Sequence, residues 1–160
     1  MLKFVDYDIV FQEIPDEVTL AINLSNCPYS CKGCHSPHLQ QDIGTALNES
    51  ALAGLLQSYG KAITCLCFMG GDADTGQLYQ LAYFVRESCG GKIKTAWYSG
   101  NDRIPDNCKA YFDFVKTGPY VEMLGGLNKS TSNQRLYRIE NGDITDITYR
   151  MQTAVESSTQ

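Results

Sequence analysis

The sequence predicts an α/β fold in which a mostly parallel sheet forms an open, partial barrel and ends in a β-hairpin. Apolar strands alternate with amphipathic helices over residues 18–116, which is typical of a parallel sheet covered by helices. The chain has 160 residues, whereas a closed eight-stranded α/β barrel needs about 250, so the sheet is expected to stay open. Asn141-Gly142 lies between two strand-like segments and indicates a hairpin turn.

The strands are predicted from short runs of apolar, β-branched and aromatic residues. The first strand leads directly into a cysteine-rich loop, and the next two end at Gly70-Gly71-Asp72 and at Ser99-Gly100. Residues 4–10 alternate loosely and are compatible with a hairpin before the first strand. The predicted strands of the parallel part are residues 18–24, 62–69, 92–98 and 111–116.

Two amphipathic helices are predicted between these strands. Asn48 is expected to cap the first, whose apolar residues recur at helical spacing as far as Gly60. Thr75 is expected to cap the second, which Gly90-Gly91 ends. Residues 105–109 are predicted to form a short turn or helix before the last parallel strand.

The composition indicates one globular domain, over residues 1–150, with residues 151–160 as a disordered tail. Hydrophobic residues make up 43% of the chain and charged residues 19%. The net charge is −5 and no basic stripe is visible, so no nucleic-acid partner is expected. Apolar runs are too short for a membrane span, and acidic residues interrupt the N-terminus where a signal peptide would be apolar. We therefore expect a cytoplasmic protein.

The most informative segment is NCPYSCKGCHSPH, residues 26–38, in which Cys27, Cys31 and Cys34 follow a CxxxCxxC spacing. The chain has seven cysteines, an odd number, and a cytosol keeps thiols reduced, so a disulfide framework is not expected. Dense cysteines in a cytosolic chain more often indicate metal binding or catalysis.

Three kinds of site are compatible with these thiols. Zinc could bind Cys27, Cys31 and Cys34 together with His35 or His38, although structural zinc sites usually join two separate ligand pairs. A thioredoxin-like pair would use Cys31 and Cys34 and would leave Cys27 without a role. A cubane iron–sulfur cluster takes four thiolates, so three would leave one iron open. An open coordination position indicates a site that binds a substrate.

The spacing of Cys27, Cys31 and Cys34 after the first predicted strand resembles the signature of the radical S-adenosylmethionine (SAM) superfamily. The resemblance implies that these residues bind a [4Fe-4S] cluster whose open iron chelates SAM, which one electron splits into methionine and a 5′-deoxyadenosyl radical. Members usually have an aromatic residue before the third cysteine, where this chain has Gly33. The resemblance therefore implies SAM contacts at Gly33 and Cys34, with His35 packing near the adenine.

Two strand ends agree with this resemblance. Gly70-Gly71-Asp72 is similar to the superfamily turn that binds the amino group of SAM, because glycines allow close approach and a carboxylate suits an ammonium. Trp97-Tyr98-Ser99-Gly100 resembles the segment that lines the same edge, which adds Ser99 as an expected SAM contact. A simple turn and ordinary strand-end packing are the structural alternatives.

The small size, these strand ends and Asn133-Gln134-Arg135 resemble the activating proteins of anaerobic ribonucleoside-triphosphate reductase, from the first strand to Arg135. The resemblance implies a radical SAM oxidoreductase that takes a hydrogen atom from a glycine of this reductase and leaves a glycyl radical there. The implied partners are the reductase and a low-potential electron donor such as flavodoxin or ferredoxin. An activase of another glycyl-radical enzyme, of the formate-lyase type, and a non-enzymatic zinc-binding module remain alternatives.

The other cysteines, Cys65, Cys67, Cys89 and Cys108, are predicted to be small buried residues and not ligands. Asn133-Gln134-Arg135 is expected either to face the partner or to cap the last hairpin.

Overall fold

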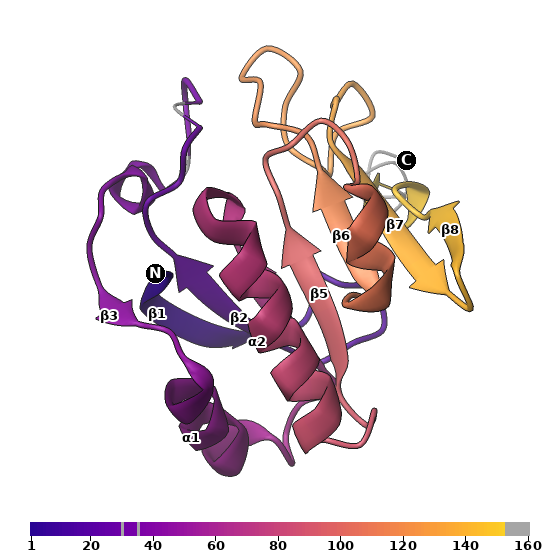
Figure 1. The fold of residues 1–160 in the computed structure, drawn as a ribbon. Helices are drawn as coiled ribbons and strands as arrows, with labels where there is room; N and C mark the ends of the chain where they lie inside the picture. Colours follow the sequence, from indigo (N-terminus) through magenta and orange to yellow (C-terminus); the bar gives the residue numbers. More distant parts are fainter. Residues whose placement is uncertain (30, 35, 153–160) are drawn as a thin grey trace.

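The computed structural model describes residues 1–29, 31–34 and 36–152, which form a mixed α/β fold built on one sheet (Figure 1). Within these residues the sheet has eight strands in the order β3-β1-β2-β4-β5-β6-β7-β8, and it does not close into a barrel. The strands are β1 (Lys3–Val10), β2 (Thr19–Leu24), β3 (Thr45–Ala46), β4 (Cys65–Met69), β5 (Lys94–Tyr98), β6 (Phe114–Thr117), β7 (Arg135–Glu140) and β8 (Asp143–Asp146).

The sheet is parallel in its centre and antiparallel at both edges. β2, β4, β5 and β6 run in one direction, with Ala21 paired to Cys67 and Cys67 paired to Ala96. β1 and β3 add antiparallel pairings at one edge, and β7 and β8 add them at the other. The sheet is therefore mixed and not mostly parallel as the sequence had suggested, because the loosely patterned N-terminal segment forms a full antiparallel strand.

Among the described residues, two α-helices lie on one face of the sheet. α1 (Glu49–Tyr59) is capped by Asn48 as predicted, since its side chain accepts a hydrogen bond from the Ala51 N–H at 2.9 Å. α2 (Thr75–Ser88) is capped one residue earlier than predicted, because the Asp74 carboxylate accepts from the Gln77 N–H at 3.2 Å. No helix within the described ranges is both long and apolar enough to cross a membrane.

Shorter helical turns connect the remaining elements. They are the 3₁₀ helices η1 (Pro37–Gln40), η2 (Asp72–Asp74) and η3 (Asp106–Ala110). After β8, residues 149–152 are α-helical. Residues 153–160, part of the segment expected to be a tail, lie outside the described residues.

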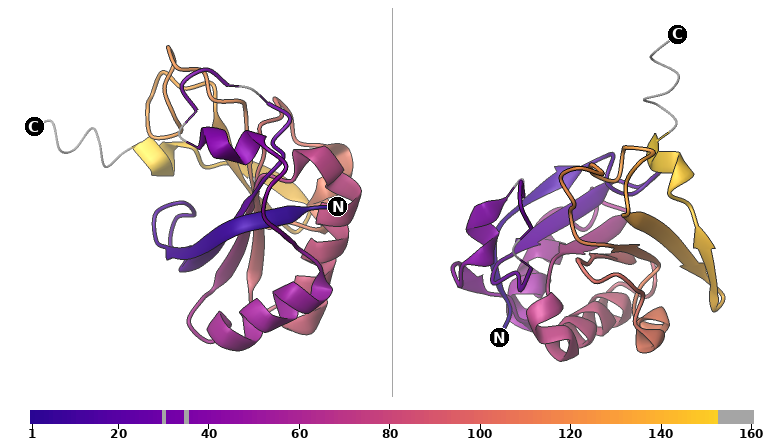
Figure 2. Two further views of the ribbon diagram at one scale, coloured as in Figure 1. Left: turned by 90° about the vertical axis from the view of Figure 1, so that its left-hand side faces the viewer. Right: turned by 90° about the horizontal axis from the view of Figure 1, so that it is seen from above.

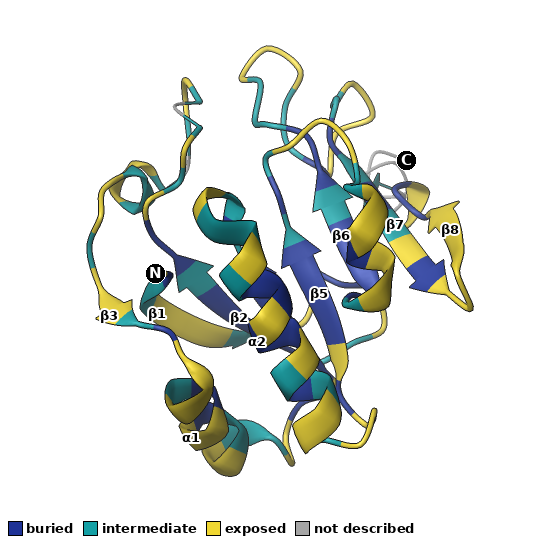
Figure 3. Cartoon of the chain, in the orientation of Figure 1, coloured by how far each residue is buried: buried dark blue, intermediate teal, exposed yellow. Residues whose placement is uncertain are grey.

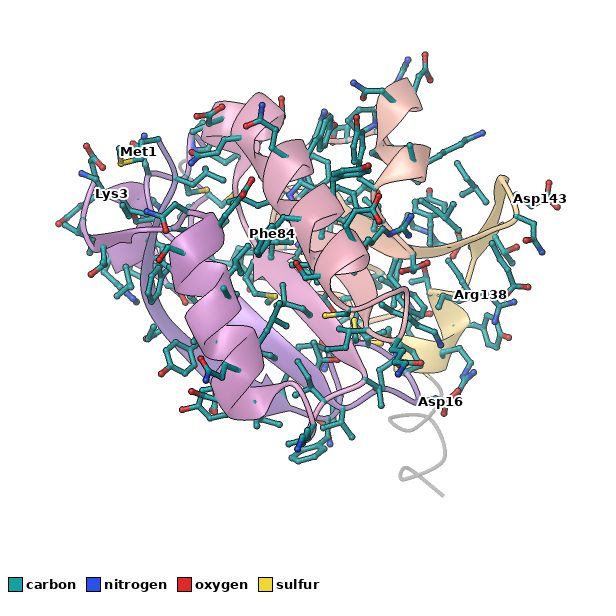
Figure 4. The ribbon with its side chains drawn as sticks, turned by 60° about the horizontal axis from the view of Figure 1, so that its bottom comes forward. Met1, Lys3, Asp16, Phe84, Arg138 and Asp143 are labelled. Atoms are coloured by element: carbon teal, nitrogen blue, oxygen red, sulfur yellow. The ribbon has the colours of Figure 1, made fainter. Side chains whose placement is uncertain are left out.

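A hydrophobic cluster fills each face of the sheet. The larger one lies under the helices, where Phe68, Trp97 and Phe112 are fully buried. Phe84 of α2, labelled in Figure 4, is partly buried against this cluster. The second cluster combines strand residues such as Cys67 with side chains from connecting segments: Ile14, Leu127 and Ile147. Burying one large apolar side chain contributes about 1.5–3 kcal/mol, so both faces contribute to stability. Figure 3 shows this burial along the central strands and on the inner side of α2.

The predicted hairpin is present between β7 and β8. Asn141 and Gly142 have φ values of 53° and 82°, the left-handed conformation that a two-residue turn of this kind requires. Arg135 donates to the Asp146 carboxylate through Nε (2.9 Å) and Nη2 (2.7 Å), which ties the two strands together.

The carboxyl ends of β2, β4, β5 and β6 meet at one edge of the sheet, uppermost in Figure 1. The loops that follow these strands gather at the same edge when the molecule is seen from above (Figure 2). Ligands of open α/β sheets bind outside the carboxyl ends of the strands, so this edge is where a site is expected.

Candidate metal centre

The cysteine loop between β2 and β3 is anchored by backbone hydrogen bonds at its base. The Asn26 N–H donates to the Gln41 carbonyl and the Cys27 N–H donates to the Leu39 carbonyl, each at 2.9 Å. The loop then projects beyond the end of β2 (Figure 1). The anchors fix where the loop starts and returns, which places its thiols at the carboxyl edge of the sheet.

All three thiols of this loop face one cavity of about 220 Å³. Cys27, Cys31 and Cys34 are half-buried and free of disulfides. Burial raises the pKa of the Cys27 thiol, whereas its hydrogen bond to the Tyr29 carbonyl (3.6 Å) lowers that pKa. The remaining lining comes from other residues of the cysteine loop and η1, from the ends of β2, β4, β5 and β6, and from the segment between β6 and β7. Loop and strand ends therefore build a single site.

The cysteines of the cavity have the donor chemistry of an iron–sulfur site. Within the described residues, no three His, Cys, Asp or Glu side chains gather closely enough around one point to hold a metal ion. Zinc draws its ligands to about 2.0–2.3 Å from one centre, whereas a cubane cluster binds each thiolate through a different iron, so its ligands stand apart. His38 lies in η1 and is not among the described lining residues. Three free thiols at one cavity could hold three corners of a [4Fe-4S] cluster and would leave one iron without a cysteine ligand.

Asp72 is a firmly held carboxylate in the same cavity. It begins η2, two glycines after the end of β4, and accepts hydrogen bonds from the Ser99 hydroxyl and from the Gly100 N–H, the latter at 3.3 Å. Burial raises the pKa of Asp72, and these two hydrogen bonds together with the charge of Lys116 oppose the rise. Two donors from the end of β5 therefore fix the direction in which this acid points.

The two glycines before Asp72 have different roles. Gly70 and Gly71 both have φ in the left-handed region, at 112° and 101°, and Gly70 lines the cavity. The Gly70 carbonyl accepts a hydrogen bond from the Trp97 indole at 2.9 Å. A Cβ at Gly71 would lie 3.1 Å from Cδ1 of Leu78, so Gly71 serves the packing of α2.

Lys116 of β6 completes the polar lining and was not predicted from the sequence. Its ammonium donates to the Ser99 carbonyl at 2.9 Å and to the Gly118 carbonyl at 3.1 Å, and it lies 5.6 Å from the ring centroid of Tyr98. Burial lowers the pKa of Lys116 to about 8, although the charge of Asp72 opposes this. Strand alternation could have indicated it, because Lys116 shares a face with Phe114 and so points away from the helices.

The predicted SAM contacts divide into three groups. Cys34, Gly70, Asp72 and Ser99 line the cavity. Gly71 does not, and Gly33 faces the loop after β6, because a Cβ at Gly33 would overlap Oε2 of Glu122 at 2.1 Å. His35 lies outside the described residues.

The remaining thiols lie away from this cavity. Cys65 and Cys67 are fully buried in the second cluster, and Cys108 is buried in the larger one, so their role in packing agrees with the prediction. Burial raises the pKa of all three. Cys89 is half-buried at the end of α2.

Asn133-Gln134-Arg135 supports the loop after β6. Asn133 donates through Nδ2 to the Pro119 carbonyl at 3.0 Å, and Gln134 donates through Nε2 to the Gly118 carbonyl at 3.3 Å. Gln134 also lines the cavity, whereas Arg135 belongs to the hairpin. The first two residues of this motif therefore shape the site.

Three free cysteines line one cavity at the carboxyl edge of an open α/β sheet, and cysteine thiolates are the donors that iron–sulfur proteins use. The chain matches the family model of the 4Fe-4S single cluster domain over residues 18–139, a span that contains the three loop cysteines, Asp72 and Lys116. The protein therefore belongs to this family, and its cofactor is a [4Fe-4S] cluster. Among curated proteins no match is found.

Proposed function

We propose that the protein is a cytoplasmic radical SAM activase, with Cys27, Cys31 and Cys34 as the ligands of its cluster. One observation carries this proposal: beside these thiols, the described lining of the cavity has one carboxylate, Asp72, and one ammonium, Lys116. The methionine end of SAM carries an ammonium and a carboxylate on one carbon. The cavity is therefore complementary in charge to the part of SAM that would chelate an open iron.

The residues of the chain bind and orient the substrate in this proposal. Asp72, held by Ser99 and Gly100, accepts the SAM ammonium. Lys116 provides the positive charge for the SAM carboxylate, and Gly70 lets the ligand approach the backbone. When bound and reduced, the cluster supplies one electron that breaks the C5′–S bond of SAM, giving methionine and a 5′-deoxyadenosyl radical that takes a hydrogen atom from a glycine Cα.

The open edge supports a protein substrate. A second cavity of about 550 Å³ adjoins the first through shared lining residues, among them Cys34, Tyr98 and Lys116. Its other walls include Gln12, Leu127 and Asn128. Because the sheet leaves this side open, a loop of the partner could enter and shield the radical from water.

The partner we propose is anaerobic ribonucleoside-triphosphate reductase, on the basis of the sequence resemblance described above. Its glycine would lose the hydrogen atom and keep a glycyl radical, while 5′-deoxyadenosine leaves. A flavodoxin or a ferredoxin would supply the electron.

SAM binding to the anaerobically reconstituted protein tests this function. The reduced cluster should give an EPR signal that SAM alters, and 5′-deoxyadenosine should form. Asp72→Asn should weaken SAM binding by about 10- to 100-fold at unchanged iron content, because a charge-assisted hydrogen bond is lost. Asp106→Asn, an exposed acid of η3, is the matched control and should bind SAM normally.

Two results would contradict the proposal. Radical SAM chemistry would be excluded if the protein bound no iron under anaerobic conditions. It would also be excluded if SAM left the EPR signal of the reduced cluster unchanged. A glycyl radical formed only on a formate-lyase-type partner would keep the chemistry and replace the reductase.

A further inference from the structure

A cavity of about 390 Å³ lies at the edge of the sheet opposite to the thiols. Its lining includes Lys94, which begins β5, Phe114, which begins β6, and Glu140, which ends β7. Because β7 runs antiparallel to β6, all three positions belong to the amino edge of the parallel strands. Figure 4 brings this end of the molecule forward and labels Arg138 of β7. We call this space the amino-edge cavity.

Cationic side chains are concentrated in the amino-edge cavity. The chain carries 13 lysines and arginines and a net charge of −5, yet four of the 11 described lining residues are cations. These four come from α2, β5, η3 and β7, and they are Arg86, Lys94, Lys109 and Arg138. The described lining has two carboxylates, Asp113 and Glu140. The cavity is therefore a positively charged concavity on an acidic protein.

An ion pair between α2 and the segment before β6 fixes one side of the cavity. Nη2 of Arg86 lies 2.9 Å from Oδ1 of Asp113. Nε of the same arginine donates to the Thr95 hydroxyl at 3.2 Å, and Nη1 donates to the Ala110 carbonyl at 3.1 Å. The second carboxylate oxygen of Asp113 accepts from the Thr95 N–H at 2.9 Å. The negative charge of Asp113 is thus compensated by the protein, so it repels a bound anion little.

Two cations of the lining have no such partner. Within the described part of the chain, neither Lys109 nor Arg138 makes an ion pair or a side-chain hydrogen bond, and both residues are exposed. Lys94 is paired with Glu17 at 2.9 Å, and Glu17 is not among the described lining residues. Lys109 and Arg138 can therefore bind an anion that enters the cavity, and Glu140 is the carboxylate that opposes it.

The size and the apolar part of the lining indicate the kind of anion. A volume of about 390 Å³ lies within the roughly 300–1,000 Å³ of ordinary small-molecule sites. Phe112, Phe114 and Ile139 supply apolar lining, and all three are buried. Lysine and arginine bind phosphates through charge-assisted hydrogen bonds. Because the cations come from separate elements, a chain of several phosphates matches them better than a single carboxylate does.

We propose that the amino-edge cavity binds a small oligophosphate, free or as part of a nucleotide, through Lys109 and Arg138. No described residue lines both this cavity and the thiol cavity, the one that the three loop cysteines line. The inference therefore does not depend on the proposed function.

Isothermal titration calorimetry of the anaerobically reconstituted protein, with inorganic triphosphate and with ATP in separate experiments, tests this site. Lys109→Gln and Arg138→Gln should each weaken triphosphate binding by about 10- to 150-fold, because a charge-assisted hydrogen bond is lost. Glu140→Gln should strengthen it by about two- to tenfold, because a like charge beside the anion is removed. Lys61→Gln and Arg103→Gln are the matched controls, since both cations are exposed and lie outside the cavity. They should stay within about twofold of the wild type.

The two ligands distinguish the two sources of the phosphates. Equal affinities would place the binding energy in the phosphates alone, whereas tighter binding of ATP would show that the nucleoside contacts the apolar lining. Either result supports the site.

Four results would overturn the proposal. The first is a wild type that binds neither triphosphate nor ATP. The second is an unchanged affinity in Lys109→Gln or in Arg138→Gln. The third is an equal loss in Lys61→Gln and Arg103→Gln, which would indicate attraction by diffuse surface charge. Lys116→Gln provides the fourth, because it removes the ammonium of the thiol cavity. A loss of triphosphate binding in that variant alone would place the anion beside the thiols.

Discussion

The cysteines of the loop after β2 (the loop thiols) and the cysteines of β4 (the core thiols) lie in two different environments. Cys27, Cys31 and Cys34 are half-buried and face a cavity, whereas Cys65 and Cys67 are fully buried among apolar side chains. Burial in a medium of low polarity disfavours the thiolate and raises the pKa of the two core thiols. A metal needs the thiolate. The comparison therefore shows that access and surroundings, more than residue type, decide which cysteines can be ligands.

The largest effect expected from this comparison is the loss of the cluster. Cys31→Ala removes one ligand and should leave the anaerobically reconstituted protein with almost no iron or sulfide, because two thiolates do not hold a cubane cluster. Iron and sulfide analysis measures this, and SAM cleavage should be lost in parallel.

Cys89→Ala is the matched control for this substitution, because Cys89 is also half-buried but lies at the end of α2, outside the cavity. It should keep its full iron content. If Cys31→Ala and the wild type had the same iron content after anaerobic reconstitution, the loop thiols would not differ from the core thiols in metal binding.

The second prediction concerns alkylation of the cluster-free protein. Iodoacetamide should modify Cys31 and Cys34 in the native fold, whereas Cys65 and Cys67 react only after unfolding, and hence at least about 1,000-fold more slowly. Mass spectrometry of the peptides gives the rates. In concentrated urea all rates should converge, and a native Cys67 that reacts as quickly as Cys31 would contradict the assigned burial.

The smallest effect is an alkaline loss of stability from a buried thiol. Burial raises the pKa of Cys108 from about 9 to about 11. The unfolded chain thus loses this proton first, so the stabilisation is complete below pH 9 and disappears as the pH rises to 11, by at most about 1.4 kcal/mol per pH unit. Urea denaturation of the wild type and of Cys108→Ala should show a difference in unfolding free energy that shrinks over this range. A constant difference would contradict the assignment.

Local signals predicted much of the fold. Asn48 caps α1 and Asn141-Gly142 turns the last hairpin, because capping and tight turns depend on a few neighbouring residues. The antiparallel pairing of β1 with β2 agrees with the hairpin that residues 4–10 were compatible with, but its length and register were not predicted, because the alternation of this segment is loose. The exact cap of α2 was missed by one residue for a simpler reason, since Asp74 and Thr75 are both good capping residues.

The residues of the candidate site that belong to a short sequence motif could be predicted. The loop cysteines and Asp72 were identified from their spacing and position, and the structure places them in one cavity. Lys116 was not identified, because what marks it is contact with a segment far along the chain, at Ser99. Such contacts leave no local periodicity to detect.

The burial of Ile14 limits how far the chain can be truncated at its N-terminus without exposing the core. The match to the 4Fe-4S single cluster domain begins at residue 18 and ends at residue 139, yet Ile14 and Ile147, from outside those limits, belong to the same buried cluster as Cys65 and Cys67. A fragment trimmed to the matched span would keep every proposed ligand and expose the apolar face behind them. The span that the family model matches is thus shorter than the span that builds the hydrophobic core.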